Sequence, residues 1–151
     1  MEPIVPANPI PPSIQHVLSR FRSMAREEKM QALVAYAKRL EPVPERLATL
    51  DRESHTVHEC QTRVDLFSEL QGGRMHFWAD VDARQSPTVA AFLAITLAAV
   101  NDQPPSTTLA VPADFVSTMM GGLGLSAREV GLNALVSRLK REARAALDSG
   151  G

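Results

Sequence analysis

The chain contains a single cysteine, Cys60, in the stretch "SHTVHECQTRVDLF" at residues 54–67. Ionisable side chains surround it, and a thiol that such neighbours help to deprotonate acts as a nucleophile or a metal ligand. The simpler alternative is a small buried hydrophobe, which is what a free cysteine most often is. The polar residues from Glu59 to Arg63 make a poor context for a core position, so the residue types alone leave both interpretations open.

A zinc site is the first chemistry that this stretch suggests. His55, His58 and Cys60 offer imidazole and thiolate groups, which are common zinc ligands. Structural zinc sites usually take four ligands from paired clusters, and no second cysteine or histidine cluster is present. The sequence therefore disfavours a metal site.

A cysteine hydrolase is the second possibility. Cys60 would be the nucleophile, His58 or His76 the base, and Asp80 or Asp82 the group that orients the base. No segment resembles an oxyanion hole, which such chemistry requires. The sequence gives this arrangement little support.

A dinucleotide fingerprint is formally present, because Gly122, Gly124 and Ala127 fit G-x-G-x-x-A. That motif must follow a β-strand, whereas a helical segment is expected just before it, around residues 114–119. The glycines are better explained as the end of a helix followed by a turn.

The segment after Cys60 predicts the element that positions it. In "RVDLFSEL" and "GRMHFWADV" apolar and polar residues alternate, and "QGG" separates the two runs, which is typical of a β-hairpin with one core face. The opposite face would carry Phe67, His76 and Trp78. Cover by a helix, or isolated surface aromatics, is favoured there over a patch that docks a partner.

Helices are expected on both sides of this hairpin. The first runs from Ile14 to about Phe21 with Ser13 as its cap, and residues 45–53 are expected to form a connecting loop. Ser86 and Pro87 begin the helix that follows the hairpin, and Ser126 with Glu129 forms a capping box for the last one. Their expected buried positions are Met30, Leu33, Val34, Ala37 and Leu40; then Val89, Phe92, Leu93, Leu97 and Val100; and finally Leu132, Leu135, Val136, Leu139, Ala143 and Leu147.

This order of elements predicts an α+β protein. Its small antiparallel β-sheet, the hairpin plus a neighbouring strand, would have helices packed on one face. Five of the eleven prolines lie within residues 1–12, which are expected to be a flexible arm, and residues 13–148 are expected to form a single domain.

Composition excludes several classes of function. The net charge of −1 does not suit a nucleic-acid binder. The apolar run at 89–100 is shorter than the roughly 18 residues that span a bilayer, so no membrane segment is expected. One cysteine cannot form an internal disulfide, and "MEPIVPANPIPPS" does not read as a secretory signal, which favours the cytoplasm.

Three segments in order resemble motifs of the SufE family, the sulfur acceptors of iron–sulfur cluster assembly. Cys60-Gln61-Thr62-Arg63-Val64 is similar to the family's Gly-Cys-Gln-Ser-x-Val segment without its glycine. Residues 77–83, "FWADVDA", are similar to Phe-x-Ala-Asp-Ser-Asp-Ala, and residues 125–132, "LSAREVGL", to Leu-Ser-x-x-Arg-x-x-Gly-Leu. The resemblance covers residues 14–147 and implies a SufE-like fold.

The resemblance also implies a function. Cys60 would accept sulfur from the persulfide of a pyridoxal-phosphate-dependent cysteine desulfurase, activate that enzyme, and deliver the sulfur to an iron–sulfur scaffold. Asp82 and Arg128 match motif positions and would support Cys60. The pyridoxal phosphate belongs to the desulfurase, so the chain itself would need no cofactor or metal and would catalyse nothing alone. A monomer or a weak dimer is expected.

Departures from the family pattern keep a second function open. Glu59 stands in place of a glycine, Asp65 in place of a common tryptophan, and Val81 in place of a serine. The alternative is an adaptor or regulator that binds a desulfurase without carrying sulfur. A cluster scaffold would need about three cysteines, and one is present.

Overall fold

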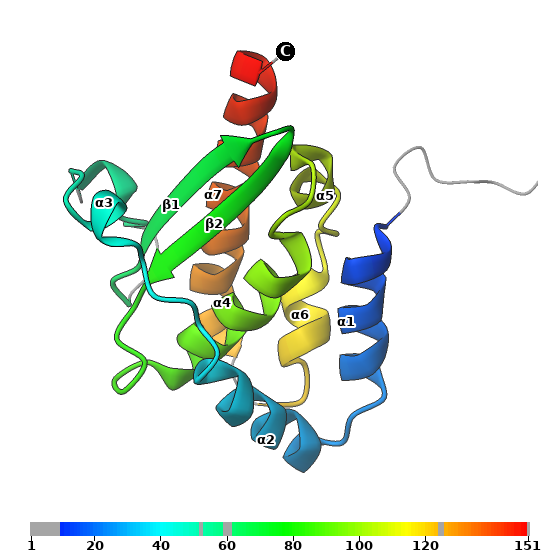
Figure 1. Cartoon of the computed structure of the whole chain (residues 1–151). Coiled ribbons are helices and arrows are strands. Elements are labelled where there is room, and N and C mark those ends of the chain that lie inside the picture. Colours follow the sequence, from blue (N-terminus) through cyan, green and yellow to red (C-terminus); the bar gives the residue numbers. More distant parts are fainter. Residues whose placement is uncertain (1–9, 52, 59–61, 124–125, 151) are drawn as a thin grey trace, which may run out of the picture.

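A computed structural model describes residues 10–51, 53–58, 62–123 and 126–150 (Figure 1). Helices come first along the chain, then a β-hairpin, then further helices, which confirms the predicted α+β fold. The elements are α1 (Pro12–Arg22), α2 (Arg26–Ala37), α3 (Glu45–Ala48), η1 (Glu53–His55), β1 (Asp65–Gln71), β2 (Arg74–Asp80), α4 (Pro87–Val100), α5 (Pro105–Leu109), α6 (Phe115–Met120) and α7 (Ser126–Gly150).

The hairpin forms in the predicted place. β1 and β2 are antiparallel, from the pair Asp65 and Asp80 at the open end to the pair Gln71 and Arg74 beside the turn. Gly72 and Gly73 make the turn with φ angles of 61° and 77°, which suit glycine and match the twist of a two-residue hairpin loop. In the described part of the chain the sheet has two strands, so the predicted neighbouring strand does not form there. Two single bridges extend the hairpin instead, Thr56 to Asp65 and Met75 to Gln103.

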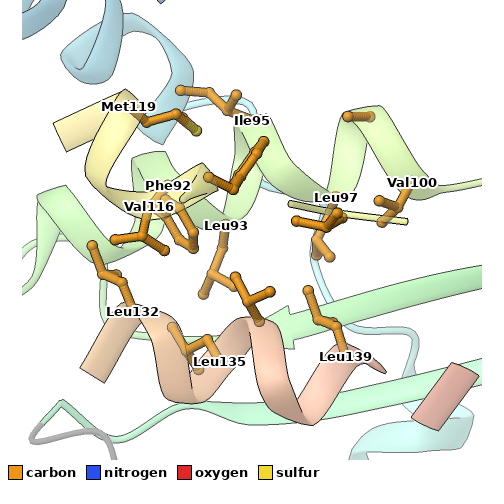
Figure 2. Packing of buried hydrophobic residues seen from close by; sticks show 14 of the residues in the cluster. Phe92, Leu93, Ile95, Leu97, Val100, Val116, Met119, Leu132, Leu135 and Leu139 are labelled. Carbon is orange, nitrogen blue, oxygen red and sulfur yellow. The ribbon is translucent and has the colours of Figure 1, made fainter. Parts of the chain in front are cut away.

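Helix α4 lies at the centre of the core. It packs against α2 and β2, and its side chains meet those of α7 (Figure 2). The sequence predicted one buried side, but the helix is buried on nearly every side. Small residues such as Ala90, Ala91 and Ala94 make this possible, because they let neighbouring elements approach faces that carry no large side chain.

A second, smaller apolar cluster covers the opposite face of the hairpin. Phe67 and Trp78 are buried there against Leu47 of α3 and the partly buried Val43. Of the two favoured alternatives, cover by a helix and isolated surface aromatics, the structure shows cover by a helix. The predicted loop at residues 45–53 is wrong at both ends, since residues 45–48 form α3 and Glu53 begins η1.

The first two helices depart from prediction in their details. Ser13 is not a cap: α1 begins at Pro12, and the Ser13 hydroxyl donates a 2.7 Å hydrogen bond to the carbonyl of Ala99. In α2, Leu33 is buried as predicted, but Met30 and Val34 are 45% and 60% exposed. Residues 1–9 of the predicted arm lie outside the described residues.

The last helix carries its predicted stripe, since Leu132, Leu135, Val136, Leu139 and Ala143 are buried. Leu147 is 39% exposed, because it lies in the last turns of the helix. The helix begins at Ser126 itself, so the capping position falls on residue 125, outside the described residues. The short α5 was not predicted, whereas α6 lies where a helical segment was expected. Across the described ranges, no helix is both long enough and apolar enough to cross a membrane.

Candidate functional site

Cys60 lies outside the described residues, but the chain on both sides of it is described. The backbone N–H of Val57 donates to the carbonyl of Val64 at 2.9 Å, and Thr56 forms a bridge pair with Asp65. Both valines are buried. The residues that flank this segment, Val57 and Val64, are therefore joined at the open end of the hairpin.

A polar pocket of about 640 Å³ lies at this end of the hairpin. It begins two residues after Cys60, and its walls come from the start of β1, the end of β2 and the connection to α4. The lining residues are Thr62, Arg63, Asp65, Asp80, Val81, Asp82, Gln85 and Ser86. Two of the three motif segments thus contribute to one cavity.

Asp65 is the most deeply buried polar group of the pocket, with 1% of its surface exposed. Its carboxylate accepts a hydrogen bond from the Thr56 hydroxyl and lies 3.6 Å from Nε of Arg63. Asp65 faces Asp80 across the hairpin, and carboxylates in directly opposite positions repel each other. The nearby guanidinium of Arg63 offsets part of that repulsion.

The hydroxyl groups of Thr62 and Ser86 lie 3.1 Å apart and form a hydrogen bond. Ser86 is the residue before α4, as predicted, but its side chain makes no capping hydrogen bond to that helix. It ties the strand side of the pocket to the start of α4 instead.

Asp82 is exposed and shapes the loop that enters α4. Its carboxylate accepts hydrogen bonds from the backbone N–H groups of Arg84 at 3.0 Å and Gln85 at 3.3 Å, and its carbonyl accepts one from Ser86. These are the local bonds by which aspartate stabilises turns. Asp82 therefore lies in the wall of the pocket with its carboxylate committed to the loop.

Arg128 is exposed in the first turn of α7. Within the described ranges, no hydrogen bond or ion pair joins it to Asp82, the other residue expected to support Cys60. Helices α4 and α7 run in the same direction in both views (Figures 1 and 2), so the two helices start at the same end of the molecule. Its supporting role stays a prediction.

The histidines do not converge on the pocket. His55 stacks on Phe67 with ring centroids 4.6 Å apart, and Nε2 of His58 lies 3.3 Å from a carboxylate oxygen of Glu53. His76 is four residues along β2 from Asp80, about 13 Å at the usual rise of a strand. Among the described residues, no group of three or more potential ligands could hold a metal ion.

The glycines of the apparent dinucleotide motif follow a helix, not a strand. Gly122 comes two residues after α6 and has a φ of 83°, as expected where a helix ends in a turn. Gly124 lies outside the described residues. The interpretation as a helix end is confirmed. The interpretation as a nucleotide site is not supported, because that motif must follow a β-strand and a helix precedes it here.

Sequence reasoning missed Asp65, which entered only as a departure from the family pattern. The strand alternation places it on the face of β1 that also carries Phe67, close to the motif cysteine in the chain. That position could have marked it as a wall of the site. Nothing local in the sequence indicated that Thr62 and Ser86 meet, since 24 positions separate them.

Comparisons with known proteins agree with this fold. The family model for SufE, described as an Fe-S metabolism associated domain, matches residues 15–143. An uncharacterised SufE-like protein of Mycobacterium tuberculosis, found in two strains, is 33% identical over 145 residues, spanning 91% of this chain and 95% of its own. The solution structure of a hypothetical protein from Thermus thermophilus matches with a TM-score of 0.75 and 29% identity, over 92% of this chain and 98% of the other.

The described chain is an α+β domain with a short hairpin and a buried central helix, and its polar pocket begins two residues after the lone cysteine in the sequence. The chain belongs to the SufE family. Membership gives it a role in iron–sulfur metabolism.

Proposed function

We propose that the protein accepts persulfide sulfur on Cys60 from a cysteine desulfurase, activates that enzyme, and passes the sulfur on for iron–sulfur cluster assembly. The Cys60 thiolate attacks the terminal sulfur of the donor persulfide. A new S–S bond forms on Cys60, the donor's S–S bond breaks, and the donor cysteine leaves as a thiolate, as in thiol–disulfide exchange.

The polar pocket is the observation that carries this proposal. It opens two residues from Cys60, and about 640 Å³ is ample for the persulfide-bearing side chain of a donor protein. Thr62, Ser86 and Arg63 bring hydroxyl and guanidinium donors to this pocket, and the proposal assigns these donors to the sulfur on which negative charge develops. Such donors stabilise a thiolate leaving group.

The composition of the chain supports carriage of sulfur in one further respect. A persulfide is open to attack by any second thiol nearby, which would release the sulfur and leave a disulfide. Cys60 is the only cysteine, so that internal side reaction cannot occur. The loaded form is then discharged only by an external acceptor, the iron–sulfur scaffold.

In this proposal the desulfurase and the carrier perform different chemical steps. Cleavage of the C–S bond of cysteine requires an electron sink, which pyridoxal phosphate provides on the desulfurase. The carrier removes the enzyme's persulfide product and so frees it for another turnover. Activity therefore shows as activation of the partner.

Intact-mass measurement after incubation with a cysteine desulfurase and cysteine tests the proposal. The wild-type chain is expected to gain one sulfur atom and to raise the desulfurase turnover. Cys60→Ser is expected to gain none and to give no activation, with the same melting temperature, because a hydroxyl replaces a thiol of similar size. Activation without any gain of sulfur would instead identify the non-carrying adaptor, and full activation by Cys60→Ser would refute the carrier.

A further inference from the structure

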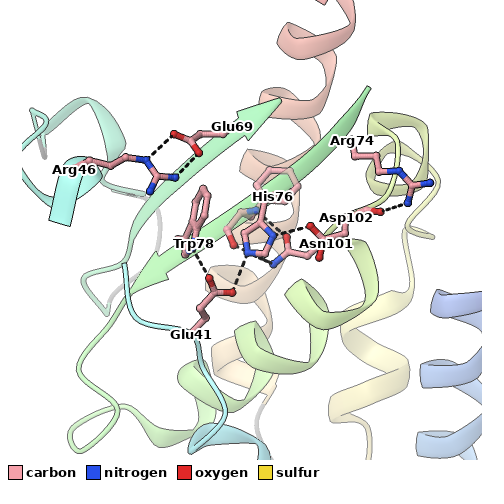
Figure 3. Close-up of polar contacts among 9 residues, drawn as sticks. Glu41, Arg46, Glu69, Arg74, His76, Trp78, Asn101 and Asp102 are labelled. Carbon is pink, nitrogen blue, oxygen red and sulfur yellow. Dashed lines mark hydrogen bonds and ion pairs between the residues drawn. The ribbon is translucent and has the colours of Figure 1, made fainter. Parts of the chain in front are cut away.

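A second polar cluster lies on the outer face of the hairpin, away from the pocket (Figure 3). At its centre is His76, whose two ring nitrogens both face carboxylates. Nε2 lies 2.9 Å from Oε1 of Glu41, in the connection between α2 and α3, and Nδ1 lies 3.0 Å from Oδ1 of Asp102, just after α4. Three segments that are distant in sequence meet at this imidazole.

The second carboxylate oxygen of Glu41 accepts a 2.6 Å hydrogen bond from the indole N–H of Trp78, whose ring lies 4.4 Å from that of His76. Glu41 is thus held by two side chains of β2. We call residues 41–48, which run from Glu41 through Val43 to the end of α3, the outer cover, because they lie over Phe67 and Trp78.

The remaining charges around His76 are already paired. Glu69, opposite His76 on β1, binds Arg46 of α3 with an N–O distance of 2.7 Å. Arg74 of β2 donates to the backbone carbonyl of Asp102. The charges facing the imidazole are therefore the two carboxylates of Glu41 and Asp102, with Glu69 neutralised by its arginine.

The two contacts of His76 with carboxylates can both be hydrogen bonds only when the ring is protonated. A neutral imidazole has one N–H and one lone pair, so it can donate to only one of two carboxylates, whereas the cation donates to both. We propose that protonated His76 is a fastener that ties the outer cover to the hairpin and to the turn after α4, and that deprotonation releases its Glu41 side.

Asn101 determines which side is released. Its orientation is set by Phe77, whose N–H donates to Oδ1 at 2.8 Å and whose carbonyl accepts from Nδ2 at 3.1 Å. The same Nδ2 lies 3.3 Å from Nε2 of His76 and still has a second hydrogen. When Nε2 loses its proton, it accepts from Asn101, while Nδ1–H continues to donate to Asp102. Glu41 is then held by Trp78 alone.

The direction of the pKa agrees with this geometry. Partial burial opposes the charged ring, but the hydrogen bonds to Asp102 and Glu41 outweigh it and raise the pKa of His76 above its ordinary value of 6.5. A raised pKa in the folded state means that the fastener contributes its full stability below pH 6.5 and loses it as the pH rises through the folded-state pKa. The outer cover is held most firmly on the acidic side.

Trp78 is the only tryptophan and reports the fastener directly. Fluorescence of the full chain between pH 5 and 9 is expected to show one transition with its midpoint above 6.5. The carboxylate of Glu41 that accepts from the indole loses its hydrogen bond to His76 in this transition, so the surroundings of the indole change. Nitrogen-15 NMR of the His76 ring is expected to show both nitrogens protonated below the midpoint and the proton on Nδ1 above it. A midpoint at or below 6.5, or a neutral ring protonated on Nε2, would overturn the proposal.

Variants assign the transition to His76. Glu41→Gln and Asp102→Asn each remove one facing carboxylate at an exposed position and are expected to lower the midpoint, whereas His16→Gln and His55→Gln are expected to leave it in place. Because Glu41 and Asp102 are exposed, their variants are expected to fold, and the test does not depend on whether the direct variant His76→Gln folds. A midpoint that moves only with His55→Gln would show that the stacked ring beside Phe67 is the group that titrates, and the proposal would be wrong.

Discussion

Replacement of Asn101 by alanine is expected to destabilise the protein more than its half-buried position suggests. Its side-chain amide pairs with the backbone of Phe77 through an acceptor and a donor, at 2.8 and 3.1 Å, as a neighbouring strand would. Phe77 is 1% exposed, so Asn101→Ala leaves one buried N–H and one buried carbonyl without partners.

The magnitude follows from those two groups. A buried polar group that loses its partner costs about 1–3 kcal/mol. Two such groups together cost about 2–6 kcal/mol. Water can reach the half-buried site and recover part of this cost, so we expect a loss near the lower end of that range, about 2–3 kcal/mol. For a chain of this size, such a loss lowers the melting temperature by roughly 4–12 °C.

Urea unfolding followed by Trp78 fluorescence and by circular dichroism measures this loss. Gln103→Ala is the matched control: it lies two residues further on and bonds Met75 through its backbone carbonyl, which the substitution keeps. Its free energy of unfolding is expected to change by less than about 0.5 kcal/mol, as for an ordinary surface position. Equal losses in the two variants, or a loss below about 0.5 kcal/mol for Asn101→Ala, would refute the view that the amide substitutes for a strand.

Two further substitutions test the site and the first helix. Arg128→Ala is expected to slow sulfur acceptance from the desulfurase at least about tenfold, or about 1.4 kcal/mol, with unchanged folding, whereas the exposed Arg144→Ala in the same helix should not; equal rates would reduce Arg128 to a surface charge. Ser13→Ala removes the hydrogen bond to Ala99 and should cost about 1 kcal/mol in urea unfolding, and no loss would return Ser13 to a dispensable position.

The hairpin was predictable because its information is local. Alternation fixes which residues share a face, and two adjacent glycines fix the turn. The register of the two strands, from the pair Asp65 and Asp80 to the pair Gln71 and Arg74, therefore follows from the sequence. The helices were harder. A period of 3.6 shows that a helix has an apolar side, but not which other elements reach it: Met30 and Val34 have the right spacing and remain exposed, while Lys29 is buried with its ammonium on the carbonyl of Gly121.

The candidate site likewise has a part that the sequence predicts and a part that only the folded chain shows. The motif positions of Cys60, Asp82 and Arg128 could be read from the chain, and the structure brings the surroundings of the first two to one pocket. The bond between Thr62 and Ser86, and the burial of Asp65, depend on how the hairpin closes against the start of α4. No sequence window contains that information, because it arises only when distant segments pack.

The turn after α4 also has a consequence for solubility. A two-stranded sheet has open edges, and an open edge is a template on which the strand of another molecule can pair and aggregate. Along the outer edge of β2, Asn101 occupies the hydrogen-bonding groups of Phe77, and the backbone of Asp102 and Gln103 occupies those of Met75. Three consecutive residues that follow a helix thus block this edge without an extra strand, and a variant that loosens the turn should form intermolecular β-sheet at concentrations where the wild-type chain stays dispersed.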